Sequence, residues 1–389
     1  MSGTLRIDPV AGAKDLDAFV RLPWRILGDD PNWVPPLLLD RRQQLSPKHP
    51  FFRHASWQGF LARRHGEIVG RVSAQIDRRN AEQGRAGLGY FGMLDAIDDA
   101  AVHAALLQAA EGWLAEQGCT RVEGPFNLNV NQELGQLIEG FDTPPYFMMP
   151  HGPRWTGDHI EAAGYGKAVD LLAYVIDPDF ERPPAMARVV DRLGDRLRMR
   201  PLNRREAEAD LRAMCAIFND AWSANWGFLP FSEEEFLAIG KEMLLAIDPD
   251  QIQLGELEGE PASFAVLLPN LNEAIRDLNG RLLPFGWAKL LWRLKVRYPS
   301  TGRVPLMGVR RAFQGGRTGA ALAFGVIDGV RAAAVRRGMH EVEMSWILEE
   351  NLPMRHILEG IGGRVSKRYR MYGRPLGQAS RDPGPALHA

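Results

Sequence analysis

The chain has 389 residues, a formal net charge of −1, 45% hydrophobic residues and 24% charged residues. This balance is typical of a folded protein of two or three domains, and it excludes the general attraction of a basic chain to nucleic acid. Two cysteines exclude a disulfide framework and fit a reducing cytosol. The first residues form no apolar signal segment, and no apolar run reaches the roughly 20 residues of a membrane span. We therefore expect a cytoplasmic protein without a nucleic-acid partner, whose contact with the inner membrane is at most peripheral.

The first half is predicted to alternate strands and helices. Strands are expected at 5–10, 56–64, 67–77, 88–94, 121–124 and 168–176, and helices at 15–22, 98–117 and 155–163. The strands at 56–64 and 67–77 form a hairpin that turns at His65-Gly66. Residues 177–184, DPDFERPP, predict a linker.

The second half repeats this plan. Strands are expected at 197–201, 252–257, 262–269, 304–309, 341–346 and 367–372, and helices at 206–222, 232–245 and 319–337. An extra helical segment stands at 286–298. Two coincidences relate the halves. Glu123 and Glu343 each follow a helix, a glycine and the start of a strand, and Tyr174 and Tyr372 each follow a Glu-x-x-Gly segment by ten residues.

Tandem copies of one fold explain both coincidences. We predict one domain at 1–180, a second at 185–376 and a disordered tail at 377–389. The first copy is longer than the second after its glutamate, which indicates an insertion at 124–155. The nine histidines show no ligand spacing, so no metal site is predicted.

The strand at 304–309, its following loop and the helix at 319–337 have the form of an anion site. Glycines let the loop turn with positive φ, and free N–H groups at the helix start point at a phosphate. The residues expected to bind it are Gln314, Gly315, Gly316, Arg317, Thr318 and Gly319 of the loop, with Met307, Gly308 and Val309 of the strand. The first half has the acidic segment DAIDDA at this point, which repels a pyrophosphate. Only the second copy is therefore expected to bind such a ligand. The alternative is an ordinary connection with a surface arginine.

This order of elements resembles the cofactor-binding half of the GNAT acyl-CoA N-acyltransferases. The segments GPFNLNVNQELGQLIEGFDTPP, FNDAWSANWGFLP and EMSWILEENLPM resemble a double-GNAT acyltransferase family that includes the bacterial ceramide synthases. The resemblance implies an α/β fold of tandem GNAT-like domains, with mixed central sheets flanked by helices. It also implies acyl-CoA as co-substrate, with no permanently bound cofactor, and transfer of a fatty acyl group to the amine of a sphingoid base. Two positions depart from the family: Arg317 replaces a loop glycine, and Leu358 replaces a tyrosine that protonates the thiolate.

Four residues are candidates for catalysis. Glu343 and Ser345 alternate along a predicted strand and therefore share one face. A carboxylate there accepts the proton of an attacking amine, or else it pairs with a nearby arginine. Tyr369 and Glu133 are further candidates, and Asn351, before the next helix, is expected to contact the cofactor.

The insertion and two tryptophans are candidates for binding the acceptor. Asn127, Asn129 and Asn131 alternate with apolar residues, so in an extended segment their amides share one face and bind hydroxyls or an ammonium. The alternative is a loop whose side chains satisfy its own turns. Trp226 and Trp346 stand in aromatic stretches that line an apolar channel or simply belong to the core.

The segment at 286–298, GWAKLLWRLKVRY, has the pattern of an interfacial helix. Trp287, Leu290, Leu291, Leu294 and Tyr298 form an apolar stripe edged by cations. Such a helix docks on a membrane or packs on its own domain with a solvated basic face. Two further functions stay open: a GNAT acetyltransferase for a small soluble amine, and a non-catalytic protein that binds acyl-CoA.

Overall fold

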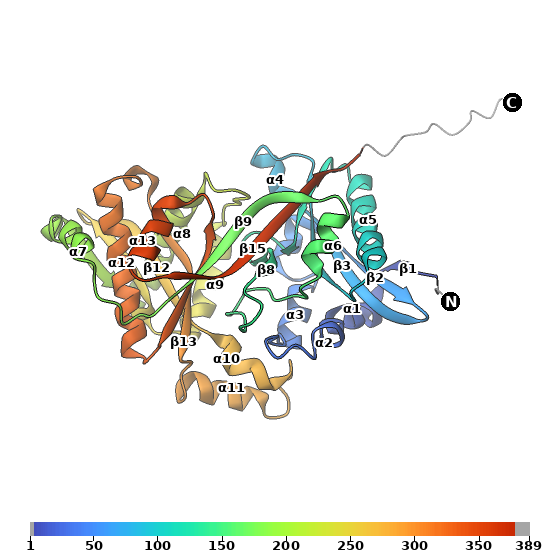
Figure 1. Cartoon of the computed structure of the whole chain (residues 1–389). Coiled ribbons are helices and arrows are strands. Elements are labelled where there is room, and N and C mark those ends of the chain that lie inside the picture. The colour runs from blue at the N-terminus through green and yellow to red at the C-terminus, as the bar shows by residue number, and fades with distance from the viewer. Residues whose placement is uncertain (1–3, 378–389) are drawn as a thin grey trace.

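The computed structural model of the chain describes residues 4–377, except for the side chains of residues 245 and 246. The tail predicted at 377–389 lies outside the described residues apart from its first position. Figure 1 shows two halves side by side, joined by two long strands that cross the middle of the molecule.

The first half is a sheet covered by one long helix and several short ones. Its strands are β1 (Arg6–Pro9), β2 (Ala55–Arg64), β3 (Glu67–Asp77), β4 (Leu88–Ala96), β5 (Arg121–Gly124), β6 (Phe126–Asn127), β7 (Glu133–Leu134), β8 (Gln136–Glu139) and β9 (Gly166–Ile176). Its helices are α1 (Gly12–Arg21), α2 (Pro23–Ile26), α3 (Leu38–Gln44), α4 (Arg79–Glu82), α5 (Ala100–Glu116) and α6 (Thr156–Ala162).

The second half repeats this arrangement and adds a helical projection. Its strands are β10 (Leu197–Pro201), β11 (Ile252–Leu257), β12 (Glu260–Pro269), β13 (Thr301–Val309), β14 (Glu341–Leu348) and β15 (Arg364–Pro375). Its helices are α7 (Pro184–Asp191), α8 (Ala207–Trp222), α9 (Glu233–Ala246), α10 (Leu271–Ile275), α11 (Gly286–Lys295), α12 (Arg317–Arg336) and α13 (Leu352–Gly360). The pair α10 and α11 projects from the lower side of the molecule in Figure 1.

The two halves share one sheet because each gives its last strand to the other. The strand order is β1-β2-β3-β4-β5-β15-β9-β14-β13-β12-β11-β10, with β8 paired to β15 and a separate β6-β7 ribbon. The second half's β15 lies beside β5, and the first half's β9 lies beside β14. The two exchanged strands pair with each other in the centre, from Arg364↔Val175 to Gly373↔Gly166. The chain therefore has an approximate two-fold arrangement about β9 and β15.

The residues that revealed the repeat are hydrogen-bonded across this exchange. The buried Tyr174 hydroxyl of β9 donates to Glu359 of α13 at 2.8 Å. The buried Tyr372 hydroxyl of β15 donates to Glu161 of α6 at 3.3 Å. Each tyrosine thus contacts the glutamate of the other copy. The predicted domain boundary between residues 180 and 185 stays a prediction. Because the two halves share one sheet, dividing the chain at this boundary would not give two separate sheets.

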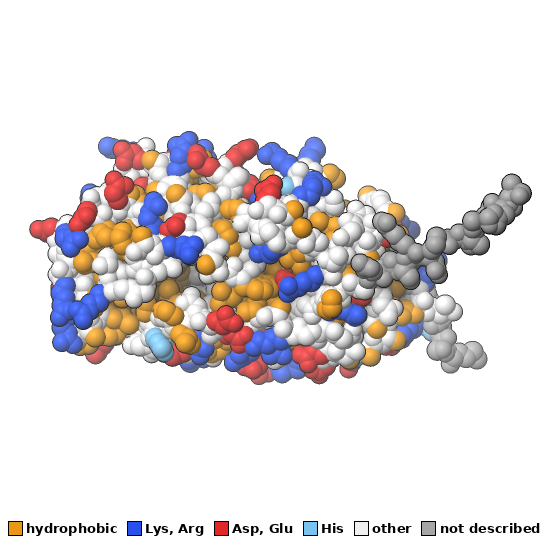
Figure 2. Space-filling view, turned by 90° about the horizontal axis from the view of Figure 1, so that it is seen from above, with side chains coloured by type: hydrophobic (Ala, Val, Ile, Leu, Met, Phe, Trp, Pro, Cys, Tyr) orange, Lys and Arg blue, Asp and Glu red, His pale blue; other side chains and the backbone are white. Residues whose placement is uncertain are grey.

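The strands and long helices predicted from the pattern are confirmed, and a Ser232–Glu235 capping box begins α9. The predictions missed α2, α3, α4, α7 and α10 and the short strands β6, β7 and β8, whose segments carry no clear period. Among residues 4–377, α12 is the one helix long and apolar enough to span a membrane, and 56% of its apolar 18-residue stretch is buried inside the protein. Seen from above in Figure 2, hydrophobic side chains gather in the middle of the face, where the halves meet.

One buried carboxylate fixes the two central strands. Asp170 of β9 is 1% exposed and pairs with Arg370 of β15 at 2.8 Å. Arg368 and Lys167 approach the same carboxylate at 3.4 and 3.3 Å. Burial alone raises the pKa of Asp170, but hydrogen bonds and charge from Arg370 and Lys167 outweigh it and hold the pKa below its usual value.

We expect Asp170→Asn to lower the free energy of unfolding at neutral pH by about 3–5 kcal/mol, the usual cost of breaking a buried pair. Because the folded pKa is lowered, this contribution is present above the unfolded value near 4 and is lost as the pH falls through the folded pKa. Urea unfolding of both proteins at several pH values measures it, with the exposed Asp191→Asn as control. A difference between variant and wild type that stays constant down to pH 2 contradicts the assignment.

Candidate active site

Parallel strands β13 and β14 diverge in the second half, and we call the gap between their backbones beyond the last paired residues the slot. They pair only from Thr301↔Glu341 to Val304↔Met344. Beyond this point β13 continues beside β12, as far as Ser263↔Val309, while β14 turns toward β9. The Trp222 indole N–H from α8 donates to the Met307 carbonyl at 2.9 Å. Met307, Gly308 and Val309 therefore lie on the slot side of a strand that has lost one neighbour.

The loop after β13 brings an uncapped helix start to this slot. Gly315 has a φ of +77°, and α12 begins at Arg317 with no side chain capping it. A Cβ at Gly319 would lie 2.1 Å from the Phe313 carbonyl oxygen, so only glycine allows the loop to approach the helix so closely. The free N–H groups of this first turn and the helix dipole favour an anion.

The two ends of the predicted loop have different roles. The Gln314 amide donates to the Val309 carbonyl at 2.8 Å and so holds the loop against β13. Arg317 is exposed and forms no ion pair within the described residues. Its charge at the first helical position therefore adds to the anion-binding character of the turn.

The equivalent slot of the first half is partly filled by the protein itself. Strands β4 and β5 also pair only at their start, from Leu88↔Arg121 to Tyr90↔Glu123. The Asn127 side-chain oxygen accepts from Met93 N at 2.8 Å. The equivalent helix α5 is capped by Asp99, whose carboxylate accepts from Ala101 N at 2.9 Å. An anion has no free helix start there, as the acidic segment predicts.

At the base of the open slot lies a buried polar cluster. The Ser345 hydroxyl donates to Glu343 at 2.7 Å and accepts from Arg303 Nε at 2.9 Å. Arg303 Nε also lies 3.5 Å from the Glu343 carboxylate. The Arg303 guanidinium stacks over Trp346, 4.6 Å from the ring centre, and donates to the Phe147 carbonyl at 2.9 Å. The structure thus brings together three predicted site residues, Glu343, Ser345 and Trp346.

Several polar atoms of this cluster are buried without a hydrogen-bond partner. They are Glu343 Oε2, Tyr369 Oη and Trp346 Nε1. Burial raises the pKa of Glu343 against the opposing attraction of Arg303. Burial and the charge of Glu343 also raise the pKa of Tyr369. A carboxylate with a raised pKa and a free oxygen is suited to accept a proton.

The sequence patterns point neither to Arg303 nor to Lys367, which are both 1% exposed. Lys367 donates to the Gly140 carbonyl and, at 2.7 Å, to the Thr143 carbonyl, so it anchors the insertion to β15. Burial lowers the pKa of Lys367 to about 8. Each of the two residues stands at the end of a predicted strand, where a single basic residue normally has a solvent-exposed side chain.

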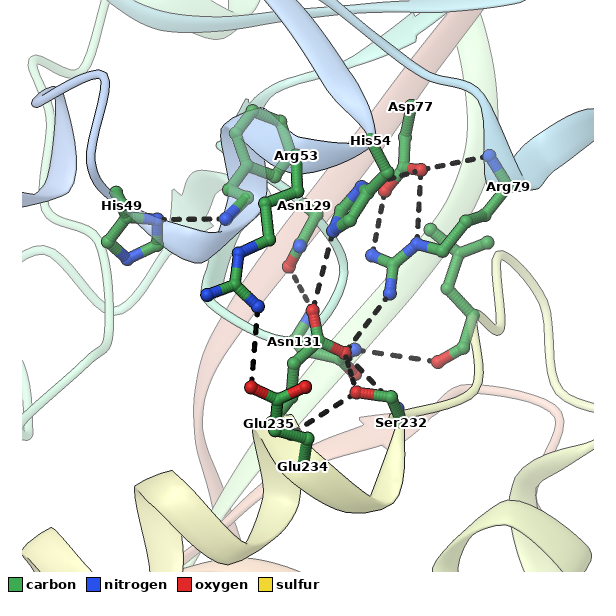
Figure 3. Close-up of polar contacts among 12 residues, drawn as sticks. His49, Arg53, His54, Asp77, Arg79, Asn129, Asn131, Ser232, Glu234 and Glu235 are labelled. Carbon is green, nitrogen blue, oxygen red and sulfur yellow. Dashed lines mark hydrogen bonds and ion pairs between the residues drawn. The ribbon is translucent and has the colours of Figure 1, made fainter.

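The single polar face expected for the insertion does not form. The segment is extended only over β6 and then turns, so Asn127, Asn129 and Asn131 diverge. Asn129 accepts from Asn131 N at 2.9 Å, and the Asn131 amide donates to Leu229 O at 3.4 Å. Figure 3 shows both beside an ionic network of His54, Asp77, Arg79 and Glu235, where the first half meets α9. Asn129 thus satisfies its own turn, as in the alternative reading, whereas the Asn131 side chain joins the insertion to the second half.

The remaining predicted residues occupy two places. Trp226 stacks on Phe126 with ring centres 6.0 Å apart, and Trp346 packs against the same central core. Asn351 accepts from Met354 N at 3.2 Å and caps α13, so its side chain has a structural role. Leu358 is buried in the core of the second half.

A cavity of about 360 Å³ lies between the first half and α10–α11. Its charged and polar lining includes Asp40, Arg41, Arg71, Asp95, Asn127, Glu133 and His151. Its apolar lining includes Trp33, Val34, Leu37, Met93, Leu94, Phe147, Met148, Met149, Ile275, Leu290 and Leu294. Of the predicted site residues, Asn127 and Glu133 line it, and Glu133 pairs with Arg41. The part of the cavity lining formed by residues 33–45 was not predicted, because the prolines and leucines of this segment indicated a loop.

The apolar stripe predicted for 286–298 is divided between two faces. Leu290 and Leu294 line the cavity, and Tyr298 packs on the core of the second half. Trp287 and Leu291 face outward, each more than half exposed. The helix therefore separates the cavity from the outer surface.

Comparison with known proteins gives two full-length relatives. The chain is 48% identical to Protein YghO of Escherichia coli (strain K12) over 359 residues, 92% of each chain. It is 45% identical to the bacterial ceramide synthase of Caulobacter vibrioides over 375 residues, 96% of this chain and 98% of the relative. No protein-family model matches the chain.

Solved structures support the fold at low sequence identity. A tandem GNAT protein from the clavulanic acid biosynthesis pathway covers 96% of this chain and 99% of its own, with TM-score 0.55 and 12% identity. A GCN5-related N-acetyltransferase from Sphaerobacter thermophilus covers 95% of this chain and 96% of its own, with TM-score 0.53 and 16% identity. The predicted fold of tandem GNAT-like domains is therefore confirmed.

Proposed function

Because the chain belongs to the family that contains the bacterial ceramide synthase of Caulobacter vibrioides and Protein YghO of Escherichia coli, we propose that it is an acyl-CoA-dependent N-acyltransferase. The donor is a fatty acyl-CoA, and the acceptor is the amine of a sphingoid base, 3-oxosphinganine or sphinganine. The observation that carries this proposal is the 45% identity to the ceramide synthase over 96% of the chain. The open slot and uncapped helix of the second half support it.

In this proposal, the second half binds the coenzyme. The first-turn N–H groups from Gly316 to Gly319 and the Arg317 side chain bind the pyrophosphate. The arm of the donor lies along β13, where a backbone N–H of the Met307–Val309 segment stabilises the oxyanion that forms at the thioester carbonyl. The first half, with its helix capped by Asp99, takes no coenzyme.

The transfer requires one proton acceptor. The amine nitrogen bonds to the thioester carbon, the carbon–sulfur bond breaks, and the amine loses a proton while the thiolate leaves. Ser345 passes that proton to Glu343, since its hydroxyl already donates to this carboxylate. Arg303 holds both groups in place and stabilises the charged carboxylate. Tyr369, with its unpartnered hydroxyl, is the nearest candidate to protonate the thiolate in place of the tyrosine that Leu358 replaces.

Incubation with palmitoyl-CoA and sphinganine should give an N-acyl product in mass spectrometry, and palmitoyl-CoA alone should raise the thermal midpoint. The variant Gly319→Ala should lose most of this shift, because its Cβ would clash with the loop carbonyl. Acylation of small soluble amines but not of sphingoid bases would favour the simple acetyltransferase. Binding of acyl-CoA without any product would favour the non-catalytic protein.

Glu343→Gln should lower turnover by at least about tenfold, because a positioned general base contributes roughly 10²–10⁴ in rate. The matched control is Glu123→Gln, the buried glutamate at the equivalent position of the first copy. It should leave turnover unchanged. Urea unfolding of both variants separates a lost base from a lost fold, and equal turnover in Glu343→Gln and wild type would exclude Glu343 as the base.

The outer face of α10–α11 supports peripheral contact with the membrane where such lipids reside. Six large apolar side chains there are at least half exposed: Leu283, Phe285, Trp287, Leu291, Trp292 and Val296. Lys289 and Arg293 pair with Asp277, while Arg281, Lys295 and Arg297 form no ion pair within the described residues. Apolar side chains beside free cations favour an anionic lipid surface.

The protein should sediment with vesicles that contain phosphatidylglycerol, and less so as the salt concentration rises. Replacing Phe285 and Trp292 together by aspartate should abolish sedimentation, because both side chains would enter the interface. Val335→Asp, at an exposed apolar position of α12, is the control and should sediment normally. Equal sedimentation of all three proteins contradicts docking through α11.

A further inference from the structure

The cavity occupies the first copy's version of the coenzyme slot. In the second copy this slot opens between β13 and β14, beyond their paired segment. In the first copy the same position is bordered by the end of β4, at Met93, Leu94 and Asp95, and by Pro125 and Asn127 after β5. The chain closes the upper part of this slot with Asn127 but leaves the cavity open beyond it. A cavity of about 360 Å³ lies within the range of small-molecule sites, roughly 300–1,000 Å³.

The polar lining of the cavity includes one unpaired carboxylate. Arg41 pairs with Glu133, and Arg71 pairs with Asp95 at 2.7 Å. Asp40 also lines the cavity, is solvent-exposed, and forms no hydrogen bond or ion pair within the described residues. Partial desolvation raises the pKa of its carboxyl, and Glu133 adds to this effect while Arg41 and His49 oppose it. This carboxylate is free to pair with a cation that enters the cavity.

Part of the cavity lining is apolar and comes from both halves. Val34 and Ile275 belong to one buried apolar cluster, against which Leu37 and Leu290 pack, and Leu294 also lines the cavity. Leu290 and Leu294 belong to α11, whose outer face bears the exposed apolar patch. A hydrocarbon chain that enters the cavity is therefore expected to contact this cluster.

One segment of the chain borders both the cavity and the buried cluster of the second half. Phe147 and Met149 line the cavity. The Phe147 carbonyl accepts from Arg303 at 2.9 Å, and the Met149 sulfur lies 3.4 Å from the Ser345 hydroxyl. The segment that borders the cavity thus also touches the proposed proton acceptors.

We propose that this cavity is the acceptor site: Asp40 binds the cationic head of a long-chain amine, and the hydrocarbon chain lies between Leu37 and Leu294 beneath α11. This assignment rests on the proposed function and specifies its second substrate. At the position where the second copy binds the coenzyme, the first copy therefore binds a lipid. The Asp40 carboxylate attracts the charged amine and repels the phosphates that the second copy binds.

Two variants of the full-length enzyme test the site in detergent-dispersed palmitoyl-CoA and sphinganine. Asp40→Asn should raise KM for the base by about tenfold, the effect of losing one charge-assisted contact, and leave KM for palmitoyl-CoA unchanged. Leu37→Trp should fill the apolar part and shift the preference of kcat/KM from long-chain toward short-chain bases. The controls are Glu116→Gln and Leu39→Trp, at exposed positions outside the cavity. If Leu37→Trp fails to fold, Leu294→Trp replaces it.

The outcomes separate this inference from the proposed function. A wild-type enzyme that forms no N-acyl product overturns both. A wild-type enzyme that forms the product, with KM for the base and chain-length preference unchanged in both cavity variants, overturns the acceptor site alone. A raised KM for both substrates in Asp40→Asn also overturns it, because a general loss of structure explains that result.

Discussion

The pairing of β9 with β15 in the centre of the sheet is the contact on which the rest of the structure depends. Each strand completes the sheet of the other copy, so neither half has a closed edge without its partner. The Asp170–Arg370 pair fixes their register, since a shift of one strand by one residue would put the two side chains on opposite faces of the sheet. Strand β15 carries Tyr369 close enough to Glu343 for the carboxylate charge to raise its pKa, and the Phe147 carbonyl of the first half accepts from Arg303 in the same cluster. The buried cluster is thus assembled from both copies.

Two copies of one fold present opposite chemistry at equivalent positions. The helix of the second copy begins with an uncapped glycine, and its dipole faces the open slot. The helix of the first copy begins at Asp99, and its slot is partly filled by Asn127. A side-chain carboxylate satisfies the donors that a phosphate would otherwise use. In the proposed function, the residue at the helix start and the insertion therefore decide which copy binds an anion and which one keeps a carboxylate-lined cavity.

The buried cluster of Arg303, Ser345 and Glu343 by itself destabilises the folded state. Removing two charges from water costs several kcal/mol for each ion, and only good geometry and further hydrogen bonds offset this cost. Here Glu343 keeps one unpartnered oxygen, so the compensation is incomplete. A group left in this state inside a core is more consistent with chemistry than with stability, because an apolar pair of equal volume would fold at least as well.

The sequence by itself determined the local elements and the repeat. Alternation and helical period predicted the strands and long helices, and the glycines of 315–319 predicted the anion loop, because these features depend on neighbouring residues. Only the tertiary structure decided that Tyr174 meets Glu359 of the other copy, that Asn131 donates to Leu229, and that Asp40 and Leu294 line one cavity. Such contacts join residues far apart in the chain. They follow from which strand pairs with which, and no periodic pattern encodes that choice.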